Sequence, residues 1–144
     1  MIRGDEPNIV ARMEPAEQAK RLARERAAIR GYELGQQKEF GAWLRRKRKA
    51  GLLNYLWPRT DKATTIQVGH WDFTIWLPRK RELRMEFKAP ARGKCSVEQE
   101  ETIALMAKLG HPVLIINDAQ QAQRLVEFAL KDQQRIYDND PSPE

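Results

Sequence analysis

Residues 83–88, Leu-Arg-Met-Glu-Phe-Lys, alternate apolar with charged side chains, a period of two that is typical of a strand with two different faces. The preceding segment, Phe73-Thr-Ile-Trp-Leu77, is rich in aromatic and β-branched residues and is separated from them by the turn-like stretch Pro78-Arg-Lys-Arg81. We therefore expect an antiparallel hairpin in which Phe87 packs into the core while Glu86 and Lys88 share the opposite face.

Helical and extended patterns flank this hairpin. Strong helix formers fill 15–30, Gly31 interrupts them, and a second helix is expected from Tyr32 to about Ala50. Further expected elements are an aromatic-rich connector at 52–60, a strand at 64–68, a helix at 96–109, an apolar strand buried on both faces at 112–116, and a helix from an N-cap at Asp118 to about Leu130. This order predicts a mixed α/β fold with a largely antiparallel part and one crossover unit.

The composition limits the classes of protein to which the chain can belong. Its 144 residues, 41% of them hydrophobic, suffice for one modest core, and the formal net charge is +6. The single Cys95 excludes an internal disulfide. Without an apolar run of membrane-spanning length or a secretory signal, we expect a cytoplasmic protein with no membrane contact. The lack of a glycine-rich phosphate loop argues against a nucleotide cofactor, and the basic excess favours a polyanionic partner.

The residues best suited to chemistry lie on the predicted hairpin. Its turn brings Asp72, at the start of one strand, back beside Glu86 and Lys88 on the other. Two clustered carboxylates repel each other unless a cation or proton lies between them, and Mg²⁺ prefers such oxygen ligands. The pattern therefore indicates a metal-assisted hydrolase site, although a solvated face with a cross-strand ion pair has the same pattern.

Four segments extend this pattern along the chain: Gly69-His-Trp-Asp-Phe73, Met85-Glu-Phe-Lys88, Gly93-Lys-Cys-Ser-Val-Glu-Gln99 and Leu109-Gly-His-Pro-Val-Leu-Ile-Ile116. In their joint order they resemble the VRR-NUC nucleases of the PD-(D/E)xK superfamily, in the stand-alone phage and bacterial form. The resemblance implies a restriction-endonuclease-like α/β core (helix, three-stranded meander, helix, strand, helix) with an extra N-terminal helix. The implied organisation is an N-terminal extension at 1–31, a nuclease domain at 32–131 and an acidic flexible tail at 132–144.

The resemblance also implies a metal site. Asp72 and Glu86 match the family's acidic ligands, and the backbone carbonyl of Phe87 would complete the set around Mg²⁺ or Mn²⁺. The family places a further glutamate on the helix before the sheet. Glu39 is our first choice for that position and Glu33 is the alternative.

Two more positions match the family's catalytic residues. Lys88 matches the catalytic lysine, and Gln99 matches a glutamine at the start of the next helix. Gln99 also has a simpler explanation, because Ser96 with a glutamine three residues later forms a capping box. The residue before the aspartate, usually proline in the family, is Trp71 here, which constrains the local backbone less.

The function implied by the resemblance is a metal-dependent endonuclease that hydrolyses DNA phosphodiester bonds. Its expected substrate is branched DNA such as a Holliday junction, cut by a homodimer in a bacterial or phage-infected cell. The basic residues suited to a phosphate backbone are Arg45, Arg46, Lys47, Arg48, Lys49, Arg79, Lys80, Arg81, Arg92 and Lys94. The alternative function is a non-catalytic nucleic-acid-binding module that retains the nuclease fold.

Overall fold

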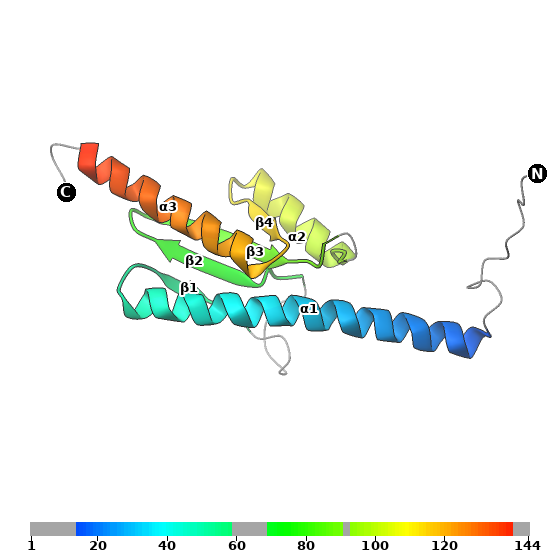
Figure 1. Cartoon of the computed structure of the whole chain (residues 1–144). Coiled ribbons are helices and arrows are strands. Elements are labelled where there is room, and N and C mark those ends of the chain that lie inside the picture. Colours follow the sequence, from blue (N-terminus) through cyan, green and yellow to red (C-terminus); the bar gives the residue numbers. More distant parts are fainter. Residues whose placement is uncertain (1–13, 59–68, 91–92, 140–144) are drawn as a thin grey trace, which may run out of the picture.

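The computed structural model describes residues 14–58, 69–90 and 93–139 of the chain. This part forms a mixed α/β fold in which three helices accompany one four-stranded sheet (Figure 1). In chain order the elements are α1 (Pro15–Lys49), β1 (Asn54–Leu56), β2 (Phe73–Leu77), β3 (Arg81–Phe87), α2 (Val97–Lys108), β4 (Val113–Ile116) and α3 (Ala119–Asn139). Within the described ranges, no helix combines the length and the apolar character that crossing a membrane requires.

The sheet has the order β1-β2-β3-β4 and confirms the predicted mixed fold with an antiparallel part and one crossover unit, although its first strand is not the predicted one. β1, β2 and β3 pair antiparallel, whereas β4 pairs parallel with β3 after the chain has crossed over through α2. Phe73 lies opposite Met85, and the hairpin turn holds Arg79 and Lys80 at a φ of 60°, a left-handed conformation that costs side-chain-bearing residues free energy. This register brings residue 72 beside residue 86.

The core lies on the face of the sheet that carries the odd-numbered residues of β2 and β3. Phe73 and Phe87 are at most 1% exposed, and their ring centroids lie 5.1 and 5.7 Å from that of Phe40 on α1. Val126 of α3 is fully buried in the same cluster. Burial of Phe87 confirms the predicted separation of the two faces of β3, because its neighbours in the chain point to the other side.

The first helix differs from the prediction, because α1 runs without a break through Gly31. A single helical glycine costs about 1 kcal/mol relative to alanine, which the good helix formers on both sides offset. Pro15 begins the helix as expected, and Gly51, with a φ of 75°, follows its end. The predicted boundary between an N-terminal extension and a nuclease domain at residue 31 therefore falls inside one helix.

Other boundaries also differ. β1 occupies 54–56, which was predicted as a connector, while the strand predicted at 64–68 lies outside the described residues. β4 was predicted to be buried on both faces, but Ile115 is 43% exposed because it lies on the face opposite the core. The Asp118 carboxylate caps α3 as predicted, accepting from Gln121 N–H at 2.7 Å, but α3 continues to Asn139, well into the predicted tail.

Candidate active site

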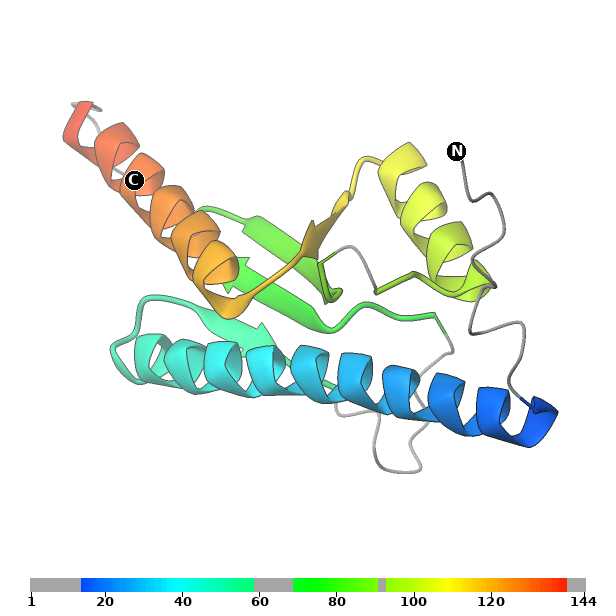
Figure 2. The same cartoon turned by 45° about the vertical axis from the view of Figure 1, so that its right-hand side comes forward.

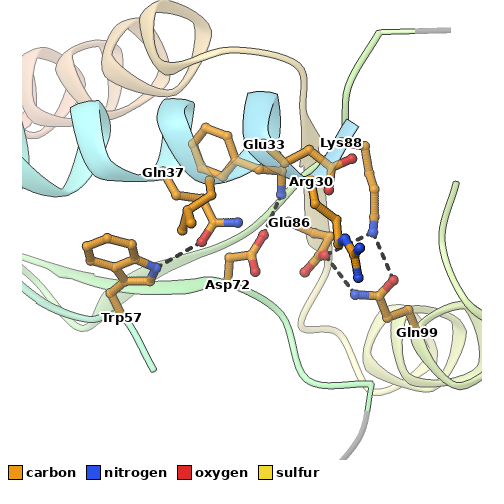
Figure 3. A pocket seen from close by; sticks show the side chains of 10 residues that line it. Arg30, Glu33, Gln37, Trp57, Asp72, Glu86, Lys88 and Gln99 are labelled. Atoms are coloured by element: carbon orange, nitrogen blue, oxygen red, sulfur yellow. Dashed lines mark hydrogen bonds and ion pairs between the residues drawn. The ribbon is translucent and has the colours of Figure 1, made fainter. Parts of the chain in front are cut away.

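A cleft of about 470 Å³ opens beside the end of the hairpin, between α1 and the first turn of α2 (Figure 3). Asp72, Glu86, Lys88 and Gln99 all line it, so the structure brings together the four predicted catalytic side chains. Its acidic lining comes from positions next to core-facing aromatic residues, since Asp72 precedes Phe73 and Glu86 precedes Phe87.

Asp72 is fixed by the backbone of the neighbouring strand. Its N–H donates to Met85 O at 3.1 Å, and its Oδ2 accepts from Phe87 N–H at 2.8 Å. These bonds continue the antiparallel pairing one residue beyond β2 and hold the carboxylate beside Glu86. Burial raises the pKa of Asp72 to about 6, against the lowering effect of the Phe87 hydrogen bond.

Glu86 is 3% exposed, although it is an ionisable residue. Its Oε1 accepts from Gln99 Nε2 at 2.7 Å and lies 3.4 Å from Lys88 Nζ, whereas its Oε2 is buried without a hydrogen-bond partner among the described residues. Burial, and then the nearby Asp72 charge, raise the pKa of Glu86 to about 8. A buried acceptor without a partner costs free energy, so this oxygen is a good position for a bound cation.

Gln99 connects the helix cap to Glu86 and Lys88 in the cleft. Its Oε1 accepts from Ser96 N–H at 3.1 Å and from Lys88 Nζ at 3.0 Å, while its Nε2 donates to Glu86. The Ser96 Oγ accepts from Gln99 N–H, which completes the capping box. The predicted capping box is therefore confirmed, and the same conformation of Gln99 also reaches the side chains that line the cleft.

Of the two candidate glutamates on α1, the structure brings Glu33 to the cleft. Its Oε1 accepts from Ala89 N–H at 2.9 Å, whereas Glu39 is exposed and does not line the cleft. A Cβ at Gly93 would lie 2.6 Å from Glu33 Oε1, so this contact requires a glycine there. Phe40, the residue next to Glu39, points into the core, and this fixes the side of α1 that meets the cleft.

Three residues with polar side-chain atoms that line the cleft were not predicted from the sequence. Trp57 Nε1 donates to Gln37 Oε1 at 3.0 Å, and the Trp57 ring stacks on Phe73 at 5.2 Å. Arg30 lies one turn before Glu33, and Figure 3 shows its guanidinium directed toward Glu86 and Gln99. The spacing of three residues between Arg30 and Glu33 puts both side chains on one face of a helix. Assigning Glu33 to the site would therefore have identified Arg30 from the sequence.

The residues around the cleft fit a hard cation only in part. Within the described ranges, no group of three or more His, Cys, Asp or Glu side chains converges closely enough to hold a metal. Asp72 and Glu86 nevertheless offer two carboxylates at one place, and the buried Oε2 of Glu86 has no other partner among the described residues. Mg²⁺ binds in this way in many proteins, through one or two carboxylates, with water and substrate oxygens as its other ligands.

None of the predicted basic residues within the described ranges lines this cleft. Arg45, Arg46, Lys47, Arg48 and Lys49 form the last turns of α1, where Lys47 and Arg48 lie over the rings of Trp43 and Tyr55. Arg81 donates to Ala129 O at 2.8 Å and so ties the hairpin to α3. Arg79 and Lys80 form the hairpin turn, Lys94 is exposed, and Arg92 lies outside the described residues. In the part of the chain that the structure describes, the cations that line the cleft are Arg30 and Lys88.

Comparisons with known proteins give no match: no family model, curated protein or solved structure aligns with the chain.

Proposed function

We propose that the protein is a metal-dependent nuclease with a restriction-endonuclease-like core of the VRR-NUC type. The observation that carries the proposal is Glu86, a buried carboxylate with one oxygen unpartnered among the described residues, beside Asp72 and Lys88 in an open cleft. A carboxylate pair held this close together at a surface opening is costly unless a cation joins it. The order of motifs from Gly69 to Ile116 supports the same assignment.

Asp72 and Glu86 would hold Mg²⁺ or Mn²⁺, with the Phe87 carbonyl as a further oxygen donor, and Glu33, which lines the same cleft, would orient a bound water. When bound, the ion supplies charge neutralisation for the phosphodiester and lowers the pKa of a water molecule.

Lys88 and Gln99 would act on the substrate and the attacking water. The Lys88 ammonium, between Gln99 Oε1 and Glu86 Oε1, can donate to a non-bridging phosphate oxygen and stabilise the charge that develops there. The amide oxygen of Gln99 holds the lysine in place. Its amide nitrogen donates to Glu86 and can orient water from this position. These roles require no movement of the core, because both side chains already border the open part of the cleft.

We further propose that the substrate is branched DNA such as a four-way junction and that the active form is a homodimer. Both proposals rest on the resemblance to VRR-NUC nucleases. A two-fold dimer carries two cleavage sites, which suits paired cuts on a symmetric junction.

The test is cleavage of labelled four-way, flap, single-stranded and duplex DNAs in the presence of Mg²⁺, Mn²⁺ or a chelator. We expect cleavage only with metal, and a loss of at least about 100-fold in Asp72→Asn, Glu86→Gln and Lys88→Met. Asparagine at position 72 keeps an acceptor for Phe87 N–H. A loss of activity in Asp72→Asn would therefore result from the missing negative charge and not from misfolding. The matched control is Glu101→Gln, which neutralises an exposed carboxylate on α2.

A wild-type protein that binds these DNAs but cuts none of them with either metal would instead be a non-catalytic binding module. Equal activity of Glu86→Gln and the wild type would also overturn the proposal.

A further inference from the structure

The N-terminal half of α1, residues 15–30, projects beyond the sheet (Figure 1, Figure 2). We call this half the arm. The buried residues of α1 all lie between 40 and 44, and every side chain of the arm is exposed or half-buried. A helix that packs so little of its surface gains little stability from the rest of the fold. The amino-acid sequence of the arm therefore reflects a role other than packing in the core.

The charges of the arm are segregated by side. With 3.6 residues per turn, successive side chains are about 100° apart, and one arc of about 160° holds only alanines and cations. The members of this arc are Ala16, Ala19, Lys20, Ala23, Arg24, Arg26, Ala27 and Arg30. Both acidic residues of the arm, Glu17 and Glu25, fall outside the arc. We call this arc the basic face.

The outer cations of the basic face, those that precede Arg30, form no ion pair within the described part of the chain. Arg21, on the opposite side, pairs with Glu25 at 3.2 Å. Among the described residues, by contrast, no ion pair or hydrogen bond holds the side chains of Lys20, Arg24 or Arg26. Three cations on one side of an exposed helix, with only alanines between them, leave both the charges and the backbone open to close approach by a polyanion.

The basic face also points in the direction of the cleft. Arg30, its last member, lines the cleft, and Leu34 and Gln37 continue the same side of α1 along it. Lys20 lies ten residues before Arg30, so the basic face extends about 15 Å outward from the cleft wall. A helix surface dominated by alanine, lysine and arginine lacks the large apolar and aromatic anchors that protein interfaces use. Its charge suits a nucleic-acid backbone better than a second copy of the chain.

We infer that the basic face of the arm is a nucleic-acid-binding surface that holds the substrate backbone on one side of the cleft. The inference rests on the proposed function for its substrate, but it concerns residues that take no part in the chemistry. Phosphate contacts position a nucleic acid without reading its sequence. The arm would therefore fix how the backbone enters the cleft, and Arg30 would receive the phosphate closest to Glu86 and Lys88.

The test compares two triple variants that remove the same charge. The first, Lys20→Gln, Arg24→Gln and Arg26→Gln, empties the basic face but leaves Arg30 in the cleft. The control, Arg21→Gln, Lys108→Gln and Lys131→Gln, removes one cation from the other side of the arm and two exposed lysines elsewhere. Glutamine is a good helix former, and circular dichroism checks that both variants keep their helix content.

The measurement is the binding of fluorescent duplex and single-stranded DNA in chelator, by anisotropy, from about 50 to 200 mM salt. Each lost phosphate contact reduces the slope of log affinity against log salt by about 0.9 for duplex and about 0.7 for single strands. We expect the basic-face variant to lose about 2 to 3 from the slope, and the control to lose clearly less.

Equal slopes in the two variants would overturn the inference, as would wild-type protein that binds no DNA. A basic-face variant that keeps its slope but changes its sedimentation would assign the surface to a second copy of the chain, which also overturns it. Because binding is measured without metal, the result is independent of cleavage. If the wild type cuts no DNA but shows the expected slopes, the nuclease proposal is refuted and the inference about the basic face stands.

Discussion

Replacing Glu86 by glutamine is expected to stabilise the metal-free protein at pH 8, although it removes the proposed activity. Glu86 is buried, and its pKa is raised to about 8 from the ordinary value of 4.5. Between these two pH values the folded chain holds a proton that the unfolded chain has released. The free energy of unfolding therefore falls as the pH rises from about 4.5 to about 8, which is the sign that linkage requires for a carboxyl group with a raised pKa.

The size of the effect follows from the same two values. Each pH unit in this interval costs about 1.4 kcal/mol, and the sum up to pH 8 is about 4 kcal/mol, allowing for half-titration of the folded state. Asp72 adds a smaller loss of the same sign between its ordinary pKa of 3.8 and about 6. A glutamine side chain cannot ionise, so the Glu86→Gln variant should exceed the wild type by no more than about 1 kcal/mol near pH 5 and by about 4 kcal/mol at pH 8.

The assay is urea unfolding followed by tryptophan fluorescence, in chelator, at intervals from about pH 5 to 8.5. The control, Glu101→Gln, should follow the wild type throughout, because its carboxylate is exposed. Added Mn²⁺ at pH 8 should stabilise the wild type and leave Glu86→Gln unchanged. If the wild-type stability does not fall between pH 5 and 8, or if the variant gains nothing at pH 8, Glu86 does not carry a desolvated charge and our account of the site fails.

Three further changes test individual contacts. Gln99→Glu keeps a residue that serves the helix cap but replaces the amide donor to Glu86 with a second carboxylate. We therefore expect unchanged helix content and a cleavage rate about 10 to 100-fold lower. An unchanged cleavage rate would limit Gln99 to capping. Gly69→Ala forces a side chain onto a φ of 88° with its Cβ 2.7 Å from Glu98 O, and thermal unfolding should report a loss of at least about 2 kcal/mol, unless the loop moves away. Gly31→Ala places a methyl group in open space on a helix and should raise the free energy of unfolding by up to about 1 kcal/mol; destabilisation would mean that α1 is bent there in solution.

The sequence predicted the hairpin and its polar end well because both depend on a local period of two. The alternation in 83–88 separates Phe87 from Glu86 without knowledge of any partner, and the short turn places Asp72 opposite. The three-residue β1 was not predictable in this way, since it is a strand because its residues pair with 74–76 of β2. Pairing of this kind depends on the rest of the sheet and leaves little trace in the segment itself.

The choice between Glu33 and Glu39 shows a second limit. Both lie on one helix, and their angular separation is known from the sequence, but the side of the helix that faces the sheet end is set by which aromatic residue enters the core. Burial of Phe40 decides this, and it turns Glu33 and Arg30 toward the cleft. The sequence predicted ten basic residues as candidates for nucleic-acid contact. Arg30, the cation on α1 that lines the cleft beside Glu86, was not among them.

α2 has no fully buried side chain. Three large apolar residues of this helix and its C-cap are more than half exposed, namely Val97, Leu105 and Leu109. The helix that carries Gln99 is therefore anchored mainly at its first turn, by bonds to Glu86 and Lys88, and only lightly along its length. Local opening of such an element costs far less than global unfolding. The wall of the cleft that carries Gln99 is therefore the part of the site that local opening exposes first, while the aromatic cluster beneath Glu86 stays intact.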